Sequence, residues 1–144
     1  MKNEEKLNVL DELNKGACMG RDSIKYVLEK VENKKLKKVL ESQAKLYEKI
    51  IKKIERKYSK YTDKEPHETS TLEKMMTWYG IQVRITSEDS ESKIAELFLK
   101  GTNMGIIEGR KLLNNKEIDK GTKDIIEEYV DFQEEYVEKL KEFL

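Results

Sequence analysis

Histidine and cysteine are the side chains that most often bind metals or act as nucleophiles, and this chain of 144 residues contains one of each. His67 lies between Glu65 and Glu68, a combination that suits a metal ligand or a general base. A zinc site needs several ligands at fixed spacing, however, and no second histidine or cysteine accompanies His67. Cys18 has no histidine to activate its thiol and cannot form an internal disulfide. We therefore expect an exposed linker histidine and a partly buried, unreactive thiol.

A second group with binding potential is rich in methionine and aromatic side chains: Met75, Met76, Trp78 and Tyr79. A flexible, polarisable patch of this kind can dock a partner helix or an apolar ligand. The simpler interpretation is that these residues lie on a short helix that covers an open end or side of the core. The sequence leaves both interpretations open.

The overall composition favours a helical protein. Charged residues make up 40% of the chain and hydrophobic residues 37%, with one proline and seven glycines, a mixture typical of long amphipathic helices. The 29 basic and 29 acidic residues cancel, so no overall field attracts nucleic acid or an anionic membrane. No apolar run approaches the roughly 20 residues of a membrane span, and residues 1–5 do not resemble a signal peptide. These features predict a cytoplasmic, all-α domain spanning 1–144, with no nucleic-acid partner, no membrane association and no cofactor.

Apolar residues recur at steps of three and four along most of the chain, which is the spacing of one helix face. Asn33 is a suitable N-cap for a second helix, and Pro66 stops any helix. Ser70 to Glu73 form a capping box that begins a short helix. The expected helices are about 3–31, 34–58, 71–85, 91–113 and 116–143.

An internal repeat supports this organisation. The stretches Leu13–Gly20 and Phe98–Gly105 match at four of eight positions, 85 residues apart, and Leu40 corresponds to Ile126 with a shift of 86. Because the turns within each half are short, the repeat predicts two antiparallel hairpins joined by a long crossover. The matched pairs are Lys15/Lys100, Gly16/Gly101, Met19/Met104 and Gly20/Gly105. The hairpins are expected at about 3–58 and 91–143, with the crossover at about 59–90.

The spacing also separates inward from outward residues. Met104 and Ile107 belong to the expected core of the third long helix, and Leu144 to that of the last. Gly16 and Gly20 each lower helix stability by about 1 kcal/mol, so we expect close approach of a neighbouring helix to compensate. Four apolar residues are expected to face outward and to supply a surface for self-association: Val9, Leu28, Ile51 and Leu113.

Two helical hairpins, a long central connection and a Lys-Gly pair in the first helix of each hairpin make the chain resemble the ferritin-like superfamily, especially rubrerythrin-like and uncharacterised ferritin-like domains. Active members of that superfamily hold two iron or manganese ions with a Glu on the first helix of each hairpin and Glu-x-x-His on the second. The corresponding residues of this chain are Ala17, Thr102, Tyr47, Ile50, Gln133 and Tyr136.

None of these six residues is a carboxylate or an imidazole, the groups that such ions require. A shift of one residue brings in Glu48 or Glu134, but it turns them toward solvent and supplies no histidine at the required spacing. The resemblance therefore implies a ferritin-like four-helix bundle with a short extra helix in the crossover and without the di-metal site.

Several polar residues are expected on the facing inner surfaces of this bundle: Gln43, Tyr47, Thr102, Gln133 and Tyr136. Buried hydroxyls and amides need partners, so we expect a polar network with a trapped water. A small-molecule pocket is the alternative use of the same positions.

Charge is distributed unevenly along the chain. Residues 34–60 include eleven basic and three acidic side chains, and residues 116–144 include ten acidic and five basic ones. In a ferritin-like arrangement the two segments are neighbours and neutralise each other in part. A free basic face would instead suit an acidic partner or nucleic acid, but the segment lacks any reading motif, so a solvated face is favoured.

Three functions are compatible with these features. The first is a non-enzymatic structural or interaction protein that associates with itself, most simply as a dimer. The second is a small-molecule-binding or stress-related module that uses the former metal cavity, lined by Tyr47, Thr102, Gln133 and Tyr136. The third, ranked last, is a degenerate metal-dependent oxidoreductase with a carboxylate-only site.

Overall fold

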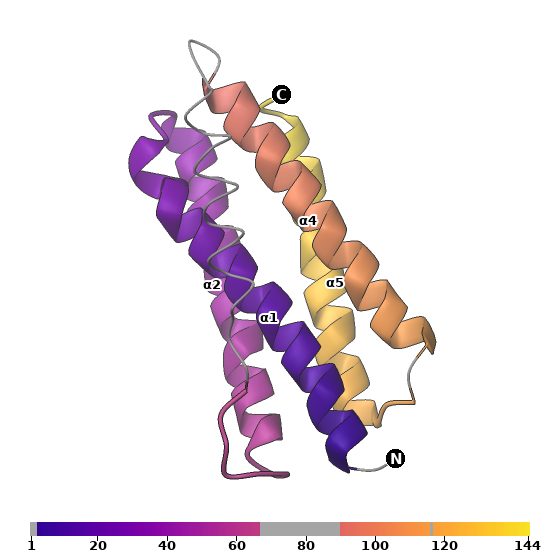
Figure 1. The fold of residues 1–144 in the computed structure, drawn as a ribbon. Coiled ribbons are helices and arrows are strands. Elements are labelled where there is room, and N and C mark those ends of the chain that lie inside the picture. The colour runs from indigo at the N-terminus through magenta and orange to yellow at the C-terminus, as the bar shows by residue number, and fades with distance from the viewer. Residues whose placement is uncertain (1–2, 67–89, 116) are drawn as a thin grey trace.

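The computed structural model describes residues 3–66, 90–115 and 117–144, and these residues form four long α-helices (Figure 1). The all-α class expected from the sequence is confirmed, with no strand in the described residues. The short helix expected at about 71–85 lies outside them, together with His67 and the patch of Met75, Met76, Trp78 and Tyr79. The helices are α1 (Asn3–Val27), α2 (Lys34–Tyr58), α4 (Ser90–Asn115) and α5 (Lys120–Lys141), and a 3-10 turn, η1 (Leu28–Lys30), follows α1.

The four helices pack as two antiparallel pairs. α1 lies beside α2, and α4 lies beside α5 (Figure 1). The pairs meet mainly where α2 packs against α5, whereas α1 and α4 touch at only a few points. Among the described residues, the α2–α5 side of the bundle is therefore more closely packed than the α1–α4 side.

Local capping residues fix two of the helix starts. Asn33 is the N-cap of α2, and its side chain accepts a hydrogen bond from the backbone N–H of Leu36 at 2.9 Å, as expected. The N-cap of α5 is Asp119, which accepts from the N–H of Thr122 at 2.8 Å. The expected start near Lys116 was therefore wrong, because apolar spacing continues outside a helix and does not reveal the capping residue.

Several residues predicted to face the core are exposed, and several predicted to face outward are buried. Met104 and Ile107 are 56% and 52% exposed, and Leu144, which lies beyond α5, is 58% exposed. Val9 and Ile51, expected on the surface, are only 3% and 4% exposed. The apolar face of a helix in a globular core is wider than the narrow heptad seam that the assignment assumed. The other two expected surface residues, Leu28 and Leu113, are partly buried against the same core.

The glycines of α1 allow close helix approach, as expected. A Cβ atom on Gly20 would lie 2.4 Å from the Tyr47 ring of α2, and one on Gly16 would lie 2.6 Å from the Tyr129 hydroxyl of α5. Such distances are far below van der Waals contact, so larger side chains do not fit at these positions.

Ion pairs between α2 and α5 neutralise part of the uneven charge. Lys49 and Lys53 both reach Glu128, and Lys57 Nζ lies 3.1 Å from Asp119 Oδ1. The basic face of α2 is therefore partly occupied by acidic residues of the same chain, in agreement with the neighbouring arrangement expected from the sequence.

Asp119 should make the fold sensitive to acid. Burial alone would raise the pKa of its carboxyl, but hydrogen bonds from Thr122, Lys57 and Tyr61 outweigh burial and hold the pKa well below its usual range. A depressed pKa adds stability above the unfolded-state value of about 3.9 and loses it as the pH falls through the folded-state value.

We therefore expect Asp119→Asn, which keeps a capping oxygen but loses the charge, to be less stable than the wild type by about 1 kcal/mol at neutral pH. The difference should shrink as the pH falls below about 4. Urea unfolding across pH measures it, with Asp124→Asn on the exposed side of α5 as the control. A difference that does not change with pH would contradict this role for the charge.

Candidate functional site

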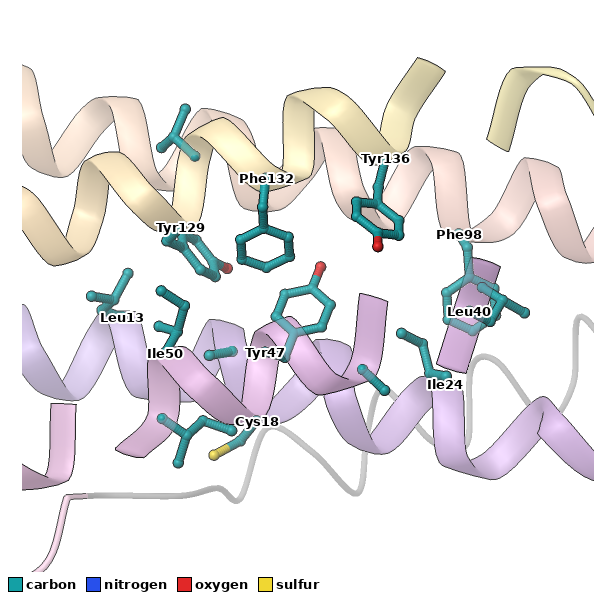
Figure 2. Packing of buried hydrophobic residues seen from close by; sticks show 14 of the residues in the cluster. Leu13, Cys18, Ile24, Leu40, Tyr47, Ile50, Phe98, Tyr129, Phe132 and Tyr136 are labelled. Atoms are coloured by element: carbon teal, nitrogen blue, oxygen red, sulfur yellow. The ribbon is translucent and has the colours of Figure 1, made fainter. Parts of the chain in front are cut away.

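The six positions that the sequence resemblance aligns with metal ligands all lie in the buried interior of the bundle. Tyr47 projects from α2 toward α5, where its ring meets Phe132 edge-on at a centroid distance of 5.0 Å (Figure 2). Tyr136 lies on the same side of α5, and Ile50 lies one turn from Tyr47 (Figure 2). The six buried residues are Ala17, Tyr47, Ile50, Thr102, Gln133 and Tyr136.

Four uncharged polar side chains from α2, α4 and α5 form hydrogen bonds with one another at the centre of the bundle. The Tyr47 hydroxyl donates to Gln133 Oε1 at 2.9 Å, and Gln43 Nε2 donates to Thr102 Oγ1 at 2.9 Å. Gln43 also approaches the Tyr47 hydroxyl at 3.4 Å, which joins the two bonds into one network. Tyr136 is not part of this network, because its hydroxyl pairs with Ser42.

This set of residues does not fit a di-metal centre. Ala17 and Ile50 carry no donor atom, and the remaining positions offer neutral hydroxyls and an amide that already have hydrogen-bond partners. Glu48 pairs with Lys25, and Glu134 pairs with Arg110, so both carboxylates are turned away from the interior. Within the described part of the chain, no group of three His, Cys, Asp or Glu residues is suitable for a metal ion.

A cavity of about 340 Å³ lies beside the network, where α1 and α4 are held apart. Its walls come from these two helices. The side facing the other pair of helices is lined by Tyr47 of α2 and by Tyr129 and Gln133 of α5. Of the six positions named above, Tyr47, Thr102 and Gln133 line the cavity; Ala17, Ile50 and Tyr136 are not among the described lining residues. The cavity is therefore adjacent to these six positions rather than centred on them.

Both copies of the internal repeat line this cavity. Three of the four matched pairs contribute residues to it from opposite walls: Gly16/Gly101, Met19/Met104 and Gly20/Gly105. Lys15 of the fourth pair also lines it, whereas Lys100 pairs with Glu96 on the outside of α4. The repeat was a sequence signal for the cavity walls, although it does not by itself reveal a space between them.

Unsatisfied polar atoms lie at or near the cavity. Ser23 lines it, and its buried hydroxyl has no hydrogen-bond partner among the described residues. The side-chain oxygen of Gln43, next to Thr102, is also buried without a partner in that part of the chain. Burial raises the pKa of the Tyr129 phenol far above its usual range, so this lining residue is a neutral group at all ordinary pH values. Sequence reasoning missed Ser23, although it continues the row of Gly16 and Gly20 along one face of α1.

Cys18 is fully buried rather than partly buried, and it belongs to the hydrophobic core. No helix in the described residues combines the length and apolar character that a membrane crossing requires. Comparison of the chain with protein-family models, with curated proteins and with solved structures gives no match in any of the three.

Proposed function

We propose that this protein is a non-catalytic binding module with a ferritin-like fold, which holds a small, mainly apolar molecule between α1 and α4. The observation that carries this proposal is the cavity of about 340 Å³. Ligand pockets commonly enclose roughly 300–1,000 Å³ among apolar side chains, with a few polar groups to orient the ligand. Here Leu13, Met19 and Leu112 supply apolar walls, and Ser23 supplies a hydroxyl that has no hydrogen-bond partner within the described residues.

Two equivalent contacts support the ferritin-like part of the proposal. Gly20 of α1 packs against the Tyr47 ring, and Gly105 of α4 packs against the Gln133 amide. The two glycines are 85 residues apart and their two partners 86, which are the offsets of the repeat. Tyr47 and Gln133 then bond to each other. Corresponding residues meeting in this way are what a duplicated hairpin with an approximate two-fold axis would produce.

Self-association is the second candidate function, but two of the four apolar residues expected to form its surface are not exposed. Val9 and Ile51 are buried in the core of the monomer. Within the described helices, Met104 and Ile107, three residues apart on α4, are the large apolar side chains that remain exposed. Two side chains are a small contact compared with the surface that a stable dimer buries, so ligand binding is the better-supported function.

The binding proposal predicts that small apolar molecules raise the unfolding temperature of the full chain in a saturable way. A ligand at a hundred times its dissociation constant should add about 2.7 kcal/mol of stability. The panel should contain alcohols of different shape, namely a linear alkanol, a branched terpene alcohol and 2-naphthol. Calorimetry follows the unfolding midpoint at increasing ligand concentration.

Two variants make this test specific to the cavity. Met19→Trp places an indole in the cavity and should abolish the stabilisation, because Met19 lines it. Asn8→Trp adds the same indole at an exposed position of α1 and should bind like the wild type. If no compound stabilises the wild type more than it stabilises Met19→Trp, the cavity is not a binding site.

A further inference from the structure

The shape of the cavity narrows the class of ligand. α1 contributes lining residues at every turn from Glu12 to Ser23, and α4 does so from Phe98 to Leu112. The two helices run in opposite directions (Figure 1), so the cavity follows both of them side by side. The eleven-residue separation of Glu12 and Ser23 corresponds to roughly 17 Å at 1.5 Å per residue. The cavity is therefore elongated along the helix axes.

The cavity is long for its volume. A volume of about 340 Å³ that extends over roughly 17 Å favours an extended chain over a compact molecule. A two-ring molecule such as 2-naphthol is shorter than the cavity and would leave part of its length without contacts.

The two ends of the cavity differ in charge. Glu12, Lys15 and Glu108 lie toward the end where α1 begins. At the other end Ser23 of α1 and Phe98 of α4 line the cavity, and the described lining residues there carry no charge. An unpaired buried hydroxyl such as that of Ser23 is unfavourable until a partner arrives. A charged ligand group would be buried at this end without a counter-ion, so an uncharged oxygen is the better partner.

We infer that the cavity binds a linear aliphatic molecule with an uncharged, oxygen-bearing end, such as a long-chain alcohol, whose oxygen pairs with the Ser23 hydroxyl. This inference rests on the binding function proposed above. Each carbon–carbon bond of an extended chain advances about 1.25 Å. A chain of about 13 carbons therefore fills the roughly 17 Å between Ser23 and the charged end.

The test is a series of straight-chain primary alcohols of about 6 to 16 carbons, delivered from cyclodextrin to the full chain. Affinity should increase about fourfold for each added methylene, because each buried methylene contributes about 0.8 kcal/mol. The increase should stop near 13 carbons, where the cavity is full. Dodecanoate, which has the same chain with a charged end, should bind at least tenfold more weakly than dodecanol. 2-Naphthol, which leaves part of the length of the cavity without contacts, should also bind more weakly than dodecanol.

Ser23→Ala tests the position of the polar end. The variant should lower the affinity for dodecanol about fivefold, because one hydrogen bond is lost, and should leave the affinity for dodecane unchanged. The free protein should not lose stability, because the variant removes a hydroxyl that is unpaired among the described residues. If 2-naphthol or dodecanoate binds as tightly as dodecanol, or if affinity is independent of chain length, the linear uncharged class is wrong while the binding function stands. If no compound binds the wild type more tightly than it binds Met19→Trp, the binding function itself is wrong.

Discussion

Gly20→Ala is expected to destabilise the protein by about 2 kcal/mol, although alanine is the better helix former by about 1 kcal/mol. The added Cβ would lie 2.4 to 2.8 Å from three carbon atoms of the Tyr47 ring. The ring cannot retreat freely, because its hydroxyl bonds to Gln133 and the ring packs against Phe132 in a T-shaped contact. Either α1 moves away from α2 or the central network breaks. Urea unfolding of wild type and variant measures the difference.

Gly121→Ala is the matched control for this prediction. Gly121 is exposed on α5, and the atom nearest to its added Cβ is Lys57 Nζ of α2 at 2.7 Å, the end of a flexible side chain. The lysine can shift at the cost of part of its contact with Asp119, so the gain in helix propensity should still dominate and the variant should be stabilised by less than about 1 kcal/mol. Opposite signs for the two Gly→Ala changes are the expected result. A Gly20→Ala variant as stable as Gly121→Ala would show that close helix packing is not the reason for this glycine.

The success of the sequence-based helix predictions depended on how local the signals were. α2 has the bounds expected for it, because Asn33 caps its start through its own side chain and the apolar spacing ends with Tyr58. The start of α5 was placed too early, because apolar spacing continues through Ile118 before the cap, although the bond from the Thr122 N–H to Asp119 is as local as the one at Asn33. The contacts of Asp119 with Lys57 and Tyr61, about 60 residues earlier in the chain, were not predictable, because partners so distant in sequence leave no local pattern.

The candidate site was likewise predictable where local spacing determines it and unpredictable where distant contacts do. Inward spacing identified Tyr47, Thr102 and Gln133, since the face of a helix follows from its period alone. The cavity could not be predicted, because its existence depends on how far α2 and α5 hold α1 and α4 apart. The same separation explains why Met104, placed in the core from its spacing, is exposed. Spacing gives the direction of a side chain but not whether another helix covers it.

Tyr47→Phe is expected to destabilise the protein by about 1–3 kcal/mol, a large effect for the loss of one oxygen atom. The hydroxyl donates to Gln133 Oε1, and the Gln133 side chain is fully buried. Gln133 cannot turn to find another donor, because its Nε2 is bonded to the Tyr129 carbonyl at 3.1 Å and its Oε1 is packed against Gly105. The variant therefore leaves a buried acceptor without its partner while the ring keeps its packing.

Tyr136→Phe removes an equivalent hydroxyl from the same aromatic cluster and is the control for this loss. Its partner Ser42 is an exposed residue, so water can replace the missing bond and the expected change is below about 0.5 kcal/mol. Urea unfolding of both variants, and of Tyr47→Phe combined with Gln133→Leu, measures the contrast. The double variant should recover stability relative to Tyr47→Phe, because replacing both partners by apolar groups removes the unpaired acceptor. If the two tyrosine variants lose the same amount of stability, the buried bond between Tyr47 and Gln133 stabilises the bundle no more than the solvent-accessible bond between Tyr136 and Ser42 does.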